Sequence, residues 1–136
     1  MDRPQLLEMA HRNSAPSVDI GRFAMVFGDW DFAPIYSGGD VIGVLMSMRN
    51  EIHMVIDVPY QRRRSNWREG LKDMVQPLID KYGKVTTVVQ NSDNTAARFI
   101  RRIGFFPTLI GKDATMYSMT TIKLKKRGAT CPQSQP

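Results

Sequence analysis

Residues 51–105 read EIHMVIDVPYQRRRSNWREGLKDMVQPLIDKYGKVTTVVQNSDNTAARFIRRIGF. The segment starts with alternating apolar and polar residues, passes through a run of arginines, and then carries two amphipathic patterns separated by a β-branched stretch. This order predicts a strand, a basic turn, a helix, a second strand and a second helix. Because a helix crosses over between them, the two strands are expected to lie side by side in one sheet.

The first predicted strand covers residues 51–58 and has two chemically different faces. One face carries Ile52, Met54, Ile56 and Val58, and the other carries Glu51, His53, Val55 and Asp57. Pro59 cannot donate a hydrogen bond to a sheet ladder, so the strand should end there and lead into the basic turn. The strand therefore presents titratable side chains opposite an apolar face.

The helix predicted after the basic turn has a start signal, a stop signal and an apolar stripe. Asn66 is expected to cap it, with Glu69 in the acidic position of a capping box, and Gly83 should end it. Pro77 lies inside the pattern and should bend the helix. The apolar stripe consists of Leu71, Met74, Val75, Leu78, Ile79 and Tyr82.

The second strand and the second helix follow at once. Val85–Gln90 is β-branched and apolar, which predicts a short buried strand. Ser92 or Asp93 should cap the next helix, and Gly104 should end it. Its apolar side consists of Ala96, Phe99, Ile100 and Ile103, and its outer side of Arg98, Arg101 and Arg102. These arginines would face solvent or a ligand.

Two N-terminal helices and two hairpins are predicted outside this segment. The helices cover Pro4–His11 and Val18–Phe27, although the second segment also permits a strand. Gly38 and Gly39 can supply the positive φ angles of a tight turn in the first hairpin. The hairpin strands are Phe32–Tyr36 with Val41–Met48, and Phe106–Ile110 with Thr115–Leu124.

Length and composition predict a single soluble domain. The chain has 136 residues, 42% hydrophobic and 24% charged, which is the usual size and composition of one domain. Residues 1–124 are expected to form it, and the polar residues 125–136 a flexible basic tail. No apolar run reaches the roughly 18 residues that span a bilayer, and the first dozen residues lack the apolar core of a secretory signal. A cytoplasmic location is therefore expected.

The net charge of +6 and the pI near 9.8 favour anionic partners, either nucleic acid or a phosphate-rich cofactor. The basic clusters are Arg62-Arg63-Arg64 with Arg68, Arg98 with Arg101-Arg102, and Lys123-Leu124-Lys125-Lys126-Arg127. Nucleic-acid binding is disfavoured because these clusters lack the interleaved exposed aromatic residues on which bases stack, with Trp67 as the exception. The single cysteine, Cys131, excludes an internal disulfide and a Cys-based zinc site, and no metal site is predicted.

Two segments resemble the GNAT superfamily of N-acetyltransferases. Residues 58–64, VPYQRRR, look like the end of the family's fourth strand and its pyrophosphate loop. Residues 93–105, DNTAARFIRRIGF, are similar to its pattern of Asn, two residues, a small residue and a helix ending in Gly-Phe. The resemblance covers about residues 30–124 and implies a three-layer α+β fold with a mixed, mostly antiparallel sheet flanked by helices. The family's first strand is not found before Leu6.

The resemblance implies an acetyl-coenzyme A-dependent N-acetyltransferase that acts on an amine, either a small molecule or a protein. The pyrophosphate would bind backbone N–H groups before the long helix. The residues assigned to the cofactor are Val58, Gln61, Arg62, Arg63, Arg64, Ser65, Asn66, Trp67, Asn94 and Arg98. The small residues of the family's loop are replaced here by Arg64 and Asn66, or by Ser65 and Trp67 in the next register. Either arginine side chains contact the phosphates, or this copy of the fold has lost the cofactor.

Acetyl transfer to an amine requires a base and often an acid. Glu51, His53 and Asp57 share one strand face, and an imidazole is the side chain whose ordinary pKa lies nearest to neutral pH. The family's tyrosine acid would stand four residues before Gly104, where this chain has Ile100. Tyr117 and Tyr36 are the remaining candidates for the acid, and Tyr117 is taken as the catalytic candidate.

The motif around Asn94, Arg98 and Gly104 also looks like trimmed, glycine-poor GNAT-like domains of short-tailed bacteriophages, including a small internal virion protein. Three hypotheses follow. The protein is an N-acetyltransferase, a catalytically degenerate phage protein of the virion or of the host interaction, or a small basic nucleic-acid-binding protein. We prefer the first. If the chain is phage-encoded, its location would be the host cytoplasm or the virion.

Overall fold

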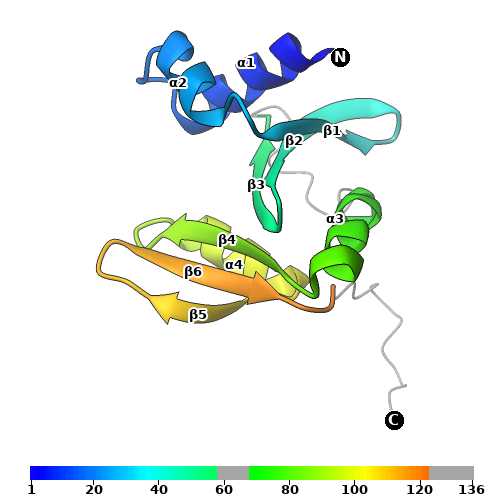
Figure 1. The fold of residues 1–136 in the computed structure, drawn as a ribbon, viewed down its shortest axis with the longest axis vertical. Coiled ribbons are helices and arrows are strands. Elements are labelled where there is room, and N and C mark those ends of the chain that lie inside the picture. Colours follow the sequence, from blue (N-terminus) through cyan, green and yellow to red (C-terminus); the bar gives the residue numbers. More distant parts are fainter. Residues whose placement is uncertain (58–67, 123–136) are drawn as a thin grey trace.

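The computed structural model describes residues 1–57 and 68–122. The helices in these ranges are α1 (Arg3–Ser14), α2 (Ile20–Phe27), α3 (Arg68–Tyr82) and α4 (Asn94–Ile103). The strands are β1 (Asp31–Ser37), β2 (Asp40–Met48), β3 (Glu51–Ile56), β4 (Val85–Gln90), β5 (Phe106–Ile110) and β6 (Ala114–Met119). Figure 1 shows that they form one strongly twisted sheet with helices packed against it.

The sheet has the order β1-β2-β3-β4-β6-β5, and its neighbours are antiparallel except for β3 and β4, which are parallel. α3 connects the two parallel strands, because a parallel pair needs a crossover. The fold is therefore α+β with a mixed, mostly antiparallel sheet, which confirms the fold class predicted from the sequence.

Two short turns build the N-terminal half of the sheet. Gly38 and Gly39, with φ of 58° and 88°, close the predicted hairpin between β1 and β2. Arg49, with φ of 55°, and Asn50 make the turn from β2 to β3. A non-glycine residue is uncommon in this left-handed region, so the turn carries some backbone strain.

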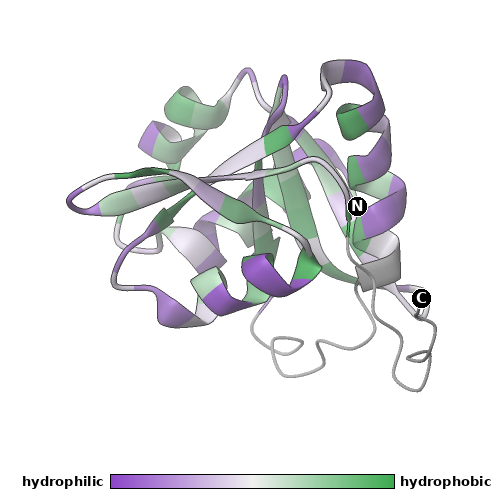
Figure 2. Ribbon diagram, turned by 90° about the horizontal axis from the view of Figure 1, so that it is seen from below, coloured by the Kyte–Doolittle hydropathy of each residue, from purple (hydrophilic) through white to green (hydrophobic). Residues whose placement is uncertain are grey.

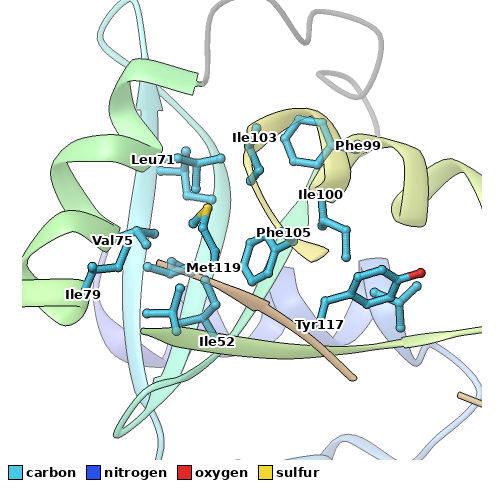
Figure 3. Packing of buried hydrophobic residues seen from close by; sticks show 14 of the residues in the cluster. Ile52, Leu71, Val75, Ile79, Phe99, Ile100, Ile103, Phe105, Tyr117 and Met119 are labelled. Atoms are coloured by element: carbon cyan, nitrogen blue, oxygen red, sulfur yellow. The ribbon is translucent and has the colours of Figure 1, made fainter. Parts of the chain in front are cut away.

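The main core lies between the sheet and the helices α3 and α4. Figure 3 shows Leu71 and Val75 of α3 and Phe99, Ile100 and Ile103 of α4 converging on Ile52 of β3 and Met119 of β6. All of these side chains are buried. Burying each large apolar side chain contributes about 1.5–3 kcal/mol, so this layer holds the two halves of the sheet together.

A second, smaller core lies on the opposite face, under α1 and α2. It consists of Leu6, Met9, Ala10, Phe23, Val44, Met46 and Val55. Val55 and Ile52 belong to different cores, as the predicted alternation along the strand requires. Figure 2 shows hydrophobic colour on the strands of the sheet and alternating hydrophobic and hydrophilic colour along the helices. No helix within the described ranges is both long and apolar enough to span a membrane.

α4 follows its sequence signals closely. The side chain of Asp93 accepts a hydrogen bond from the backbone N–H of Ala96 at 3.1 Å, so Asp93 is the cap, not Ser92. Gly104 ends the helix with φ of 124°. Pro77 does lie inside α3, as predicted. The predicted cap at Asn66 and the predicted tail, residues 125–136, lie outside the described residues.

α1 is longer than predicted. It begins at Arg3, where Asp2 and Gln5 form a capping box, and it continues past His11 to Ser14. Asn13 and Ser14 lie in the last turn, where their side chains donate hydrogen bonds to the carbonyls of Met9 (2.8 Å) and Ala10 (2.6 Å). No strand precedes α1 in the described ranges.

β6 is shorter than the predicted Thr115–Leu124. It ends at Met119, which pairs with Val85, the first residue of β4. The other neighbour, β5, begins at Phe106 opposite Ser118. Beyond Met119 neither flanking strand offers a partner, so residues 120–122 leave the sheet.

Candidate functional site

The parallel strands β3 and β4 are joined at one end only. In the described structure they are in register at a single pair, Glu51 with Thr86, and the N–H of Thr86 donates to the carbonyl of Asn50 at 2.8 Å. Beyond this pair the strands diverge, and Figure 1 shows them opening away from each other. A sheet that splits in this way leaves a wedge between its two halves.

A cavity of about 580 Å³ occupies this wedge. β3 contributes His53, Met54 and Ile56 to its wall; β4 contributes Thr87, Val88, Val89 and Gln90; and Asp93, Thr95, Ala96, Phe99 and Ile100 come from α4 and the turn before it. The volume lies within the range of small-molecule sites in proteins. The lining is mainly apolar with a few polar groups, which is also typical of such sites.

Apart from His53 of β3, the polar groups of the lining lie on the β4 and α4 side. Thr87 is buried, whereas Gln90 and Thr95 are exposed at the surface of the protein. The carboxylate of Asp93 is already engaged as the cap of α4. The free hydrogen-bonding capacity of this wall therefore comes mainly from hydroxyl and amide groups, which suit a neutral, amide-containing ligand better than a free charge.

His53 is the titratable imidazole of the cavity wall, and Glu51 lies beside it. Nε2 of His53 and Oε2 of Glu51 are 3.1 Å apart, and the two side chains are 31% and 41% exposed. The ring of Trp30 packs against the imidazole, with 5.3 Å between the ring centroids. If Nε2 donates to Glu51, Nδ1 keeps a lone pair that can accept a proton. The pair can therefore act as a general base.

Asp57 shares the strand face of His53 but bonds to α1 and does not line the cavity. Its carboxylate accepts a hydrogen bond from Nδ2 of Asn13 at 2.8 Å and is paired with Nη2 of Arg12 at 3.4 Å. Its side chain is 15% exposed, and it is not among the cavity-lining residues. Asp57 therefore ties the end of β3 to the last turn of α1.

Tyr117, the predicted acid, lies one strand behind the cavity. It is opposite Thr87 in the β4–β6 ladder and is buried, with the guanidinium carbon of Arg101 5.7 Å from its ring centre. Figure 3 shows its ring next to Ile100. The position of the family's tyrosine, Ile100, does line the cavity. The other candidate, Tyr36, is exposed on β1.

The residues predicted to bind the cofactor divide into two groups. Val58, Gln61, Arg62, Arg63, Arg64, Ser65, Asn66 and Trp67 lie outside the described residues. Asn94 is the first residue of α4, exposed, and adjacent in sequence to the cavity-lining Asp93 and Thr95. Arg98 is exposed, further along the same helix.

Thr87, Gln90, Thr95 and Trp30 were not identified from the sequence. Thr87 is a threonine in a β-branched strand, which by itself indicates only a good strand former. Trp30 lies in the link between α2 and β1 and meets His53 across a sequence gap that no local pattern reveals. Only the separation of β3 from β4 brings Thr87, Gln90 and Thr95 to a common cavity, and Trp30 is connected to that cavity through its ring contact with His53.

No protein-family model and no curated protein sequence matches this chain. Solved structures do match it. The ribosomal-protein-S18-alanine N-acetyltransferase from Escherichia coli is similar with a TM-score of 0.63 and 15% identity, over 96% of this chain and 96% of that chain. The PaiA N-acetyltransferase from Thermoplasma acidophilum in complex with coenzyme A has a TM-score of 0.57 and 12% identity, over 86% of this chain and 91% of that one.

A GNAT family acetyltransferase from Elizabethkingia anophelis with acetyl-CoA bound is also similar, with a TM-score of 0.59 and 15% identity. That match covers 88% of this chain and 91% of the other. The matches therefore span most of the length of both chains. At such low identities they show a common fold and do not show a common activity. The chain has the fold of the GNAT N-acetyltransferases.

Proposed function

We propose that this protein is an N-acetyltransferase that uses acetyl-coenzyme A and an amine acceptor. The observation that carries the proposal is the cavity between β3 and β4, with His53 in its wall and Glu51 bonded to that imidazole. Two proteins of the same fold hold coenzyme A or acetyl-CoA in their solved structures, which supports the choice of ligand.

The described residues fit the pantetheine arm of such a carrier. The arm is a chain of methylene and amide groups, and the wedge offers an apolar wall from Met54, Ile56 and Val88 with Thr87 and Gln90 as hydrogen-bonding groups. Asn94 and Arg98 would lie toward the nucleotide, and the arginines at 62–64 remain the predicted phosphate ligands. When bound, the thioester supplies an activated acetyl group.

His53 would accept the proton that leaves the acceptor amine, and Glu51 would stabilise the resulting imidazolium. The nitrogen then forms its bond to the acetyl carbon as the carbon–sulfur bond breaks. Glu51 is well placed for this role because a carboxylate next to an imidazolium forms a charge-assisted hydrogen bond. Deprotonation at a fixed position is worth typically about 100- to 10,000-fold in rate.

Within the part of the chain that the structure describes, the cavity lining offers no tyrosine that could act as the acid of the reaction. Ile100 lines the cavity where the family's tyrosine would stand, and Tyr117 is outside the lining. Solvent would therefore protonate the departing thiolate, which is a tolerable leaving group because the ordinary pKa of a thiol is about 8.5. The same observation favours a second candidate, a catalytically inactive protein that keeps the fold.

Calorimetric titration with acetyl-coenzyme A separates the two candidates. The proposal predicts micromolar binding that is strongly weakened in a variant with Arg62→Ala, Arg63→Ala and Arg64→Ala. Arg22→Ala is a matched control, because Arg22 is exposed on α2, away from the cavity lining. Absence of heat at millimolar ligand would rule out the enzyme. With binding established, thiol release measured over a panel of polyamines and peptide amines identifies the acceptor.

A further inference from the structure

The link between α2 and β1, residues 28–30, carries an aromatic contact to the cavity wall. The Trp30 ring lies 5.3 Å from the imidazole of His53 and 5.3 Å from the ring of Phe27, measured between centroids. The backbone N–H of Trp30 donates to the carbonyl of Phe27 at 3.1 Å. Trp30 is half-buried and packs against the smaller core, while its backbone belongs to the link.

Arg3 holds this link from α1. Its Nη1 donates to the carbonyl of Trp30 at 2.7 Å, and its Nη2 donates to the carbonyl of Gly28 at 2.5 Å. The guanidinium carbon also lies 4.7 Å from the ring centre of Phe32, two residues further along. One side chain thus contacts both ends of the link and the start of β1.

The position of Arg3 in its helix argues for a specific role. Arg3 is the first residue of α1, where a positive charge faces the positive end of the helix dipole, an unfavourable placement. The capping box of Asp2 and Gln5 fixes this first turn. Two carbonyls beside each other suit the planar fork of a guanidinium, which a lysine ammonium cannot reproduce.

We propose that Arg3 is a positioning residue of the site: it fixes the Gly28–Trp30 link so that the Trp30 ring holds His53 on Glu51. The contacts run from Arg3 to Trp30, from Trp30 to His53, and from His53 to Glu51 at 3.1 Å. An imidazole confined between a ring and a carboxylate has little freedom to turn away from the cavity. An effect of Arg3 on catalysis rests on the proposed function, whereas the positioning of His53 by Arg3 does not.

Solution NMR of the full chain tests the positioning directly. The protein has two histidines and two tryptophans, so the ring signals can be assigned by substitution. We expect an NOE between the Trp30 and His53 rings in the wild type and its loss in Arg3→Ala, with altered ring ¹⁵N shifts of His53. Arg22→Ala removes another exposed arginine from the same helical layer and should leave both signals unchanged.

If Arg3→Ala does not fold, Arg3→Lys keeps the charge but cannot donate to both carbonyls in the same geometry, and it should weaken the NOE. An Arg3 variant that folds and keeps the NOE and the ¹⁵N shifts, even with a lower melting temperature, would overturn the proposal. Arg3 would then be only an anchor of α1.

The kinetic arm links this positioning to the reaction. Arg3→Ala should lower kcat by about 10- to 100-fold, because a displaced base loses its geometry, with KM for acetyl-coenzyme A changed by less than about two-fold. An equal kcat in folded Arg3→Ala and wild type contradicts a catalytic consequence. Absence of turnover in the wild-type protein would refute the proposed function. The NMR experiment would still decide whether Arg3 positions His53.

Discussion

Nε2 of His53 lies 3.1 Å from Oε2 of Glu51, two residues earlier on the same face of β3. Because this pair is the proposed base, His53→Ala should lower kcat by about 100-fold or more, and Glu51→Gln by about 10-fold or more. Steady-state rates with an acceptor identified by the panel measure both effects. A His53→Ala enzyme with wild-type kcat would remove the imidazole from the mechanism.

Asp57 should behave as a structural residue, although it shares the strand face of His53. Asp57→Ala removes the partner of Arg12 and Asn13, and we expect a loss of about 1–2 kcal/mol in the free energy of unfolding with kcat nearly unchanged. Urea unfolding and steady-state kinetics provide the two readouts. A large fall in kcat at unchanged stability would assign Asp57 to the chemistry instead.

Ile100 lines the cavity at the position where the resemblance to the GNAT superfamily predicts a tyrosine, and it is 4% exposed. Ile100→Tyr would place a phenol there, at a packing cost of about 1–3 kcal/mol that Ile100→Phe should share. If the missing acid limits turnover, the tyrosine variant should have a kcat several-fold above that of the phenylalanine variant. Equal rates in the two folded variants would show that leaving-group protonation is not limiting.

The core between α3 and the sheet should tolerate little truncation. Leu71 is 3% exposed and packs in the same cluster as Ile52, so Leu71→Ala should lower the free energy of unfolding by about 2–5 kcal/mol. Met25→Ala is the control, because Met25 is 85% exposed on α2. Similar unfolding midpoints for the two variants would contradict the packing of α3 against the sheet.

Local signals predicted the elements well. The strand faces of β3 follow from the alternation, although β3 ends at Ile56 and Val58 lies outside the described residues, and α4 follows from Asp93 and Gly104. The end of β6 was wrong because the pairing of Met119 with Val85 sets it, and that pairing joins residues far apart in sequence. The length of α1 was wrong because Asn13 and Ser14, which favour turns and helix ends, lie inside its last turn with their side chains bonded to carbonyls one turn earlier.

The candidate site was predictable only in part. His53 and Glu51 were found because they share a strand face, and Ile100 was found by its distance from Gly104. The wedge between β3 and β4 cannot be predicted from the local sequence pattern. It arises because the two strands do not pair beyond Glu51 and Thr86, and these strands are far apart in the sequence. Asp57 bonds to Asn13 and Arg12, more than forty residues earlier, which is likewise invisible locally.

Several inferences from the sequence stay predictions. The use of acetyl-coenzyme A by this chain, the role of Arg62-Arg63-Arg64, the cytoplasmic location, the phage origin and nucleic-acid binding are among them. The first of these matters most, because acetyl-coenzyme A bound in the wedge would connect the arginines and the His53–Glu51 pair to one reaction.

Chemical-shift mapping with acetyl-coenzyme A on ¹⁵N-labelled protein tests the central claim most directly. The account predicts that the largest amide shifts fall on both walls of the wedge, at His53–Ile56 of β3 and Thr87–Gln90 of β4, and at the first turn of α4. Shifts confined to other surfaces, or no shifts at millimolar ligand, would contradict it.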